Sequence, residues 1–162
     1  MITERLRLVP LTEEHRQAFQ QSREAFAGLL GVTLPEGWPE FPEAFGPGFP
    51  ATPPPWSAYL FLHRHEPKLI GNGGYVGAPD DEGAVEIGYE IGPAEQGQGY
   101  ATEAAGAMVA TAFEAGARAV IAHSLAETNA SNGVMKKLGM RFEAELEQEG
   151  MRIWRWRLDR PA

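Results

Sequence analysis

Cysteine is absent from this chain of 162 residues, and its absence excludes several kinds of site at once. Without a thiol, the chain can form no disulfide scaffold, thiolate zinc site, iron–sulfur cluster or cysteine nucleophile. His63 and His65 lie two residues apart, but no carboxylate accompanies them at a spacing typical of metal ligands. We therefore expect neither a metal centre nor a covalent intermediate on a thiol.

Basic residues and long apolar runs are also scarce. Lys and Arg number 14 against 22 Asp and Glu, and the net charge of -8 has the wrong sign for a protein that neutralises nucleic-acid phosphates. A cationic or amine-bearing partner fits better, although such a charge also keeps many proteins soluble. No stretch approaches the ~20 apolar residues that span a bilayer, and the opening MITERLRLVPL alternates Arg with Leu, unlike a signal peptide. We expect a cytoplasmic protein that binds neither nucleic acid nor membrane.

The length fits a single domain over 1–162. Apolar residues alternate with the period of a strand in some segments and recur at helical spacing in others. Thr12 is expected to cap the first helix, which should end near Gly28 or Gly31. This order predicts an α/β (α+β) three-layer domain, a mixed sheet of about seven strands flanked by about four helices. The predicted helices cover 13–30, 100–116 and 132–138, and the predicted strands 5–9, 57–64, 68–77, 84–92, 119–125, 141–147 and 151–158.

A proline-rich segment interrupts this pattern. Eight of the 13 prolines fall between residues 35 and 55, where regular hydrogen-bond ladders cannot form because proline lacks the N–H donor. We expect a long loop over about 31–56, with one short helix near residue 40. Its aromatic side chains argue against disorder and favour a lid over the functional site. These aromatic residues are Trp38, Phe41, Phe45, Phe49 and Trp56.

A glycine-rich turn follows the strand over 84–92 and opens onto the helix that starts at Tyr100. The first amides of a helix have no internal acceptor and lie at the positive end of its dipole, so a phosphate can accept several of them. Gly97 and Gly99 omit the β-carbons that would hold a phosphate away from the backbone. The turn predicts an anion site, although two glycines before a helix also form ordinary tight turns. It is neither a dinucleotide fingerprint nor a Walker loop.

The segment VEIGYEIGPAEQGQGYATEA resembles motif A of the GNAT acetyltransferases, which move an acetyl group from acetyl-coenzyme A (acetyl-CoA) to an amine. The pyrophosphate loop of that family reads Gln/Arg-x-x-Gly-x-Gly/Ala, and here it is QGQGYA over 96–101. Downstream, AHSLAETNASNGVMKKLGMRFE is similar to the family's fifth strand, next helix and Lys-Leu-Gly turn. The opening over 3–11 looks like the RimJ/RimL-like branch, the ribosomal-protein-alanine acetyltransferase-like proteins. The resemblance covers all but the proline-rich segment and implies acetyl-CoA as co-substrate.

The resemblance also implies which residues bind acetyl-CoA. Loop amides would bind the pyrophosphate, and the end of the fourth strand would pair with the pantetheine arm. Ser131 matches a serine that lies near the thioester in the family. The branch commonly has an asparagine three residues earlier, where this chain has Thr128 followed by Asn129, and Asn129 and Ser131 are equally compatible with a helix N-cap. The implied set is Ile91, Gly92, Gln96, Gly97, Gln98, Gly99, Tyr100, Ala101, Thr102, Asn129 and Ser131.

Acetyl transfer to an amine requires a base, and three residues are candidates. Glu86 and Glu90 flank Gly88 on what strand alternation makes one face, and a carboxylate beside an apolar cleft can relay a proton through water. Glu86 is the first choice. His123, on the strand over 119–125, has an ordinary pKa near 6.5 that suits proton transfer. Each of these residues is also compatible with a purely structural role.

No general acid is evident. Some relatives use a tyrosine four residues before the glycine of the Lys-Leu-Gly turn, and Met135 stands there in this chain. A cysteine-like thiolate, with a pKa of ~8.5, is disfavoured at pH 7 by only about 2 kcal/mol, so an acid is helpful rather than essential. Ser131, water or bulk solvent remain as routes for the returning proton.

The last predicted strand carries Trp154 and Trp156 on one face and Arg155 and Arg157 on the other. Strand alternation therefore favours core packing or an interface over a nucleic-acid-binding stripe. The chain is compatible with a monomer or a homodimer.

We predict an acetyl-CoA-dependent N-acetyltransferase that acts by direct attack of the amine, with Glu86 and Ser131 as catalytic residues. The acceptor is a small-molecule amine or a protein N-terminus: an amino acid, a polyamine, an amine antibiotic or a protein α-amine. The alternative is a non-catalytic sensor module of the same fold that binds acetyl-CoA or CoA. A protein that binds nucleotide phosphates is a further alternative.

Overall fold

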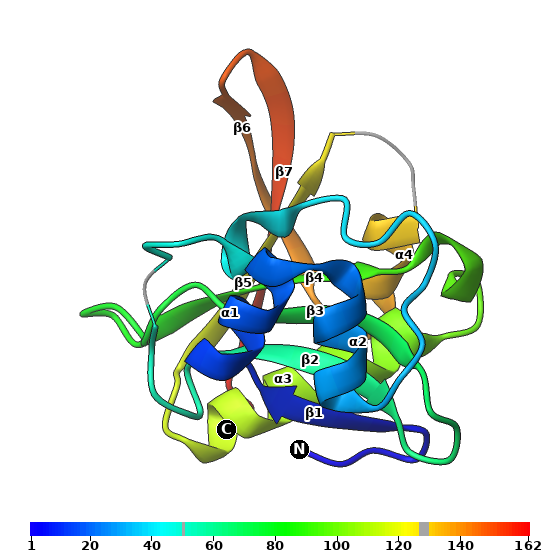
Figure 1. The fold of residues 1–162 in the computed structure, drawn as a ribbon. Coiled ribbons are helices and arrows are strands. Elements are labelled where there is room, and N and C mark those ends of the chain that lie inside the picture. Colours follow the sequence, from blue (N-terminus) through cyan, green and yellow to red (C-terminus); the bar gives the residue numbers. More distant parts are fainter. Residues whose placement is uncertain (50, 127–129) are drawn as a thin grey trace.

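The computed structural model describes residues 1–49, 51–126 and 130–162 (Figure 1). Seven strands form one mixed sheet in the order β1-β2-β3-β4-β5-β7-β6, in which only the central pair of β4 and β5 is parallel. This is the sheet expected from the sequence. The strands are β1 (Leu6–Pro10), β2 (Ala58–His63), β3 (Leu69–Tyr75), β4 (Ala84–Ile91), β5 (Ala119–Leu125), β6 (Arg141–Gln148) and β7 (Met151–Asp159).

Four α-helices and two short 3-10 helices accompany the sheet in the described part of the chain. The helix expected over 13–30 is in fact two helices, because Ser22 is extended (φ -170°, ψ 161°) and its Oγ accepts the N–H of Ala25 at 2.9 Å. A serine side chain can replace a helical carbonyl as acceptor and so begin a new helix. Thr12 caps the first helix as predicted, and Gly31 ends the second. The helices are α1 (Glu13–Gln21), α2 (Arg23–Leu30), η1 (Pro42–Phe45), η2 (Pro93–Glu95), α3 (Tyr100–Glu114) and α4 (Ala130–Lys137).

The sheet has a hydrophobic core on each face. Along β2, Phe61 packs with α3 and α4 on one face, whereas Leu60 and Leu62 pack with α1 and α2 on the other. This alternation follows from the strand period of two. The two cores give a three-layer arrangement, with α1 and α2 in front of the sheet in Figure 1 and α3 behind it.

The proline-rich segment belongs to the core on the side of α1 and α2. Trp38 and Phe45 are fully buried there, and the 3-10 helix η1 is the short helix expected near residue 40. Side chains of the helices donate to carbonyl oxygens of the segment: Arg16 Nε to Ala44 at 3.0 Å and Gln20 Nε2 to the carbonyl of Phe45 at 3.0 Å. The segment is therefore bonded to α1 at η1 and packed into the core through Trp38 and Phe45.

The hairpin of β6 and β7 projects beyond the rest of the sheet (Figure 1). Trp156 is buried and its Nε1 donates to Ser124 Oγ at 3.1 Å, while Trp154 is half-buried. Both indoles meet the ring of Phe142 edge to face. The expected packing role of the two tryptophans is therefore confirmed.

Glu103, in the first turn of α3, holds the N-terminal segment. Its carboxylate accepts hydrogen bonds from Thr3 Oγ1 at 2.5 Å and from the backbone N and Nε of Arg5, each at 2.8 Å. Burial alone would raise the pKa of Glu103, but these hydrogen bonds outweigh it and hold the pKa below the ordinary 4.5. The segment before β1 is thereby fixed to the start of α3.

We expect Glu103→Gln to lower the free energy of unfolding at pH 7 by about 1–2 kcal/mol, because a charged acceptor of three hydrogen bonds is lost from a partly exposed site. A carboxylate with a depressed pKa stabilises the fold above its unfolded pKa, and this contribution disappears as the pH falls through the folded pKa. Urea titrations should therefore show the two proteins converging as the pH falls below the ordinary pKa of 4.5. Glu114→Gln, at the exposed far end of α3, is the control; a pH-independent gap between Glu103→Gln and the native protein would contradict the assignment.

Candidate active site

The two central strands separate before they end. β4 and β5 pair from Ala84 opposite Ala119 to Ile87 opposite Ala122, and no further pair follows, although both strands continue. β5 remains paired with β7 as far as Leu125. Residues 88–91 of β4 therefore border a gap in the middle of the sheet.

The backbone of β4 presents Tyr89 and Ile91 to this gap. The carbonyl oxygen of Glu86 accepts the N–H of Val76, which directly follows β3, and the N–H of Gly92 donates to the carbonyl of Ile70 at 2.9 Å. The backbone groups of the even-numbered residues of β4 therefore bond toward β3. Because successive residues of a strand direct their backbone groups to opposite edges, Tyr89 and Ile91 face the other way. Gly92 is among the residues expected to pair with the pantetheine arm, and its N–H is already bonded to Ile70 O.

The glycine-rich turn has the geometry expected of an anion site. Gly97 and Gly99 have φ of 78° and 86°, in the left-handed region that favours glycine. Gly99 is the N-cap of α3, and no side chain caps the first amides of this helix. A β-carbon on Gly97 would meet nothing within 4 Å, so the space above the turn is open. Open space in front of uncapped amides suits a phosphate group.

Arg5 supports the turn from outside. Its Nη1 donates to Gln98 O at 3.0 Å, and its guanidinium lies 4.2 Å from the centre of the Tyr100 ring. Gln98 Nε2 donates to Glu95 at 3.4 Å. Through these contacts Gln98, one of the residues expected to bind the co-substrate, stabilises the turn from outside, and it does not line the cavity between β4 and β5.

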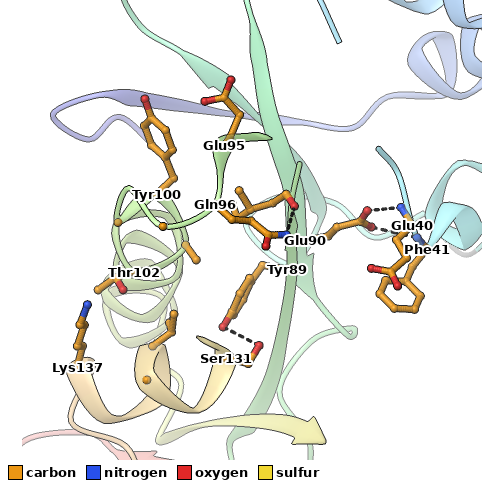
Figure 2. Close-up of a pocket in the computed structure, with 16 residues that line it drawn as sticks. Glu40, Phe41, Tyr89, Glu90, Glu95, Gln96, Tyr100, Thr102, Ser131 and Lys137 are labelled. Carbon is orange, nitrogen blue, oxygen red and sulfur yellow. Dashed lines mark hydrogen bonds between the residues drawn. The ribbon is translucent and has the colours of Figure 1, made fainter. Parts of the chain in front are cut away.

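A cavity of about 530 Å³ occupies the gap (Figure 2). This volume lies within the range of small-molecule sites. Of the residues expected to bind the co-substrate, the cavity is lined by Ile91, Gln96, Gly97, Gly99, Tyr100, Ala101, Thr102 and Ser131. Asn129 lies outside the described residues. Lys137, from the last turn of α4, also reaches the cavity and places a positive charge near the start of α3.

Tyr89 and Ser131 meet inside the cavity. The Tyr89 hydroxyl donates to Ser131 Oγ at 3.4 Å (Figure 2). Burial raises the pKa of Tyr89, and the hydrogen bond with Ser131 offsets only part of that rise, so the hydroxyl keeps its proton at neutral pH. Ser131 lies inside α4, which begins at Ala130, so it is not the N-cap. Met135, which stands where some relatives have a tyrosine, is buried. The tyrosine hydroxyl near Ser131 belongs instead to Tyr89 on β4.

Glu90 points to the opposite side of β4 and holds the proline-rich segment (Figure 2). Its two carboxylate oxygens accept the backbone N–H groups of Glu40 and Phe41, the latter at 3.1 Å. Glu40 and Phe41 line the same cavity, and Phe41 is 60% exposed. The segment thus supplies one wall of the site, and Glu90 fixes that wall.

Glu86 and His123 are in contact on the face of the sheet that carries Glu90. Oε1 of Glu86 contacts Nδ1 of His123. Their side chains are 33% and 25% exposed, and neither lines the main cavity. Two residues that sequence reasoning offered as alternative bases are therefore one unit, in which the carboxylate can orient the imidazole and leave Nε2 as the basic nitrogen.

Charged groups of both signs line the cavity (Figure 2). Uncapped amides and Lys137 lie on the side of α3, where Glu95 also lies and is paired with Lys68, and the carboxylates of Glu40 and Glu90 lie on the other side of β4. Within residues 1–49, 51–126 and 130–162, no group of three or more His, Asp or Glu is placed to hold a metal ion. Across the same ranges, no helix is both long and apolar enough to cross a membrane.

Comparison with known proteins gives the family. The sequence profile of the Acetyltransferase (GNAT) domain matches residues 5–141. A GNAT-family acetyltransferase from Bacillus anthracis superposes with a TM-score of 0.70 at 20% identity, covering 98% of this chain and 97% of its own. The spermidine N-acetyltransferase of Vibrio cholerae, in complex with CoA and spermine, superposes with a TM-score of 0.58 at 16% identity over 64% of each chain. No curated protein matches the sequence significantly.

The chain belongs to the GNAT acetyltransferases, and its seven-stranded fold is the fold of that family. It is therefore an acetyltransferase, as the resemblance predicted. The ribosomal-protein-alanine acetyltransferase-like branch stays a prediction.

Sequence reasoning missed two features of the site. It gave Tyr89 no role, and it did not connect Glu90 with the proline-rich segment. Alternation along β4 already placed Tyr89 opposite to Glu90, but the partners of both residues lie about 40 to 50 positions away in the chain. No local pattern carries such a contact.

We expect Glu90→Gln to loosen the wall formed by Glu40 and Phe41. A glutamine offers one acceptor oxygen where the carboxylate offers two, so at least one of the two amides loses its partner. Hydrogen exchange of these amides should quicken about five- to tenfold, which corresponds to about 1 kcal/mol of lost hydrogen bonding. Glu36→Gln, exposed in the same segment, should change nothing, and unaltered protection in Glu90→Gln would refute the assignment.

Proposed function

We propose that this acetyltransferase moves the acetyl group of acetyl-CoA to a primary amine by direct attack of the amine. The observation that carries the proposal is the cavity in the gap between β4 and β5, which joins an anion-binding turn at one end to carboxylates at the other. An acyl carrier with phosphates and an amine that is cationic in water would enter from opposite ends. The chain has no cysteine for an acyl-enzyme, which supports direct transfer.

The residues at the gap fit acetyl-CoA. Amides of residues 97–102 and the Lys137 ammonium group suit the pyrophosphate, and the backbone edge of Tyr89 and Ile91, which has no neighbour strand, suits the pantetheine arm. Gly92 is replaced in this role by Tyr89. When bound, acetyl-CoA supplies the activated thioester. The protein's part is to orient the thioester and the amine and to move the protons.

The pair of Glu86 and His123 is the base in this proposal. At pH 7, removing the proton costs about 1 kcal/mol for an α-amine with a pKa of ~7.7–8.0 and about 4.6 kcal/mol for a lysine-like amine with a pKa of ~10.4. His123 Nε2 accepts the proton, directly or through a water, and Glu86, in contact with Nδ1, holds the imidazole in place. Glu86 is thus assigned a positioning role in place of the direct role expected first.

The hydroxyls of Tyr89 and Ser131 are assigned to the leaving group. They lie in the cavity at the place where Ser131 matches the family serine near the thioester. A protonated Tyr89 donates a hydrogen bond to a developing thiolate, which at pH 7 lies only about 2 kcal/mol above the thiol. The thiolate then takes its proton from water or bulk solvent, either directly or relayed through the Ser131 hydroxyl, which is reprotonated in the same step.

The acceptor class proposed is a cationic primary amine. Glu40, Glu90 and the net charge of -8 favour a positive substrate, and Phe41 offers it an apolar surface. The spermidine N-acetyltransferase with which this fold superposes binds spermine, so polyamines belong on the list of acceptors to test. The list also contains protein N-termini, which the RimJ/RimL-like resemblance implies, amino acids and amine antibiotics.

Turnover of acetyl-CoA with this panel of amines tests the proposal. Free thiol can be detected directly, because the protein has none of its own. We expect coenzyme A binding by calorimetry and amine-dependent thiol release with at least one acceptor class. Binding without turnover on any amine would favour the sensor module, and competition by ATP at comparable affinity would favour a nucleotide-phosphate site.

Replacement of His123 by Gln should lower kcat/KM about 10²- to 10⁴-fold, the usual contribution of a general base. Glu86→Gln should have a smaller effect, because the imidazole remains and only its orientation is lost. In both variants the acid limb of the pH profile should change while the Kd for coenzyme A stays the same. His65→Gln, at an exposed position, serves as control; native pH profiles in both site variants would remove the pair from the mechanism.

A further inference from the structure

Gly88 is an exposed residue in the middle of the central strand. β4 is the fourth of seven strands, and Gly88 lies between Ile87, which is buried, and Tyr89, which is half-buried. Residues at the centre of a large sheet with helices on both faces are normally covered. The face that carries Glu86 and Glu90 is therefore open at this point.

Neither packing nor backbone geometry requires a glycine here. On the neighbouring strand β3, a β-carbon at Gly71 or Gly73 would lie 2.1 or 2.5 Å from a carbonyl oxygen of β4, so those glycines are needed for close strand packing. A β-carbon on Gly88 would meet nothing within 4 Å, and its φ is not in the left-handed region. The space above Gly88 is free to hold something other than the protein's own side chains.

The open space lies between two parts of the site. Glu86, Gly88 and Glu90 share one face of β4. The usual rise of a strand puts the α-carbons of Glu86 and Glu90 about 13 Å apart. At one end His123 contacts Glu86, and at the other Glu90 holds the wall of Phe41 and Glu40. Gly88 is the midpoint between the proposed base and that wall.

We propose that the acceptor amine lies across Gly88 and that the missing side chain at this position determines which amines can react. The inference rests on the acetyl transfer proposed above and adds the path of the second substrate. The reacting nitrogen lies toward Glu86 and His123, where its proton is removed, and the rest of the acceptor lies toward Phe41.

The shape of this path sets a preference. A side chain on Gly88 would project into the space beside the reacting nitrogen, because the β-carbons of a strand stand perpendicular to the sheet. Amines with an unbranched carbon next to the nitrogen need the least width there. Acceptors branched at that carbon should be the first to be excluded when the space is narrowed.

Gly88→Ala and Gly88→Val test the inference. Both residues fit the backbone, and valine is favoured in strands, so the fold should be kept. For the best acceptor of the panel, we expect KM to rise about tenfold in Gly88→Ala and about a hundredfold or more in Gly88→Val. An analogue methylated at the carbon next to the nitrogen should lose more than its parent. The Kd for coenzyme A should stay within twofold, and Gly28→Ala, an open glycine in α2, should change neither value.

Calorimetric titration of the amine into the protein loaded with coenzyme A gives a second readout that needs no turnover. Weaker amine binding in Gly88→Ala supports the path even if Gly88→Val does not fold. Unchanged KM and unchanged amine binding in a Gly88→Ala variant that binds coenzyme A would overturn the inference and leave acetyl transfer standing. Absence of amine-dependent thiol release by the native protein would instead overturn the proposed function, and this inference with it.

Discussion

The parting of β4 from β5 is the constraint on which the rest of the site depends. A sheet held together at its centre would separate the helices α3 and α4 from the proline-rich segment. Because the ladder stops at Ile87 and Ala122, the backbone of Tyr89 and Ile91 loses its neighbour strand and becomes available to a ligand. Unpaired backbone groups inside a protein are costly. Ile91 O is satisfied by Gln96 Nε2 at 3.1 Å, and a bound extended chain would satisfy the others in the manner of an added strand.

The gap also connects two regions of opposite charge. In the proposed function, the amide end of α3 and Lys137 attract the anionic carrier, whereas Glu40 and Glu90 attract a cationic amine. Each substrate is thereby favoured at its own end of the cavity. In the proposed mechanism, the reacting atoms meet where the sheet is open, with the hydroxyls of Tyr89 and Ser131 on one side of β4 and the pair of Glu86 and His123 on the other.

The proline-rich segment shows how a chain without regular structure becomes a fixed wall. Its prolines remove N–H donors, so its carbonyl oxygens need donors from elsewhere. Side chains of α1 and α2 provide them: Arg16 and Gln20 to the end of η1, and Arg23 to the carbonyl of Trp38. Glu90 performs the converse task for two amides of the segment. Packing of aromatic rings then buries the segment's apolar residues.

Much of the fold could be predicted from the sequence, because periodicity and turn residues are local. The strand over 119–125, the cap at Thr12 and the glycine turn before α3 are as expected, since each depends on a few adjacent residues. The break at Ser22 was missed because its side chain can either extend a helix or restart one. The proposed anion-binding part of the site, which lies in one continuous turn, could likewise be predicted from the sequence.

The proposed acceptor part of the site depended on the tertiary structure, which joined Glu86 to His123, Glu90 to Phe41 and Tyr89 to Ser131. Such pairs are set by strand register and by where a ladder stops, and neither is written in the residues on one side of the contact.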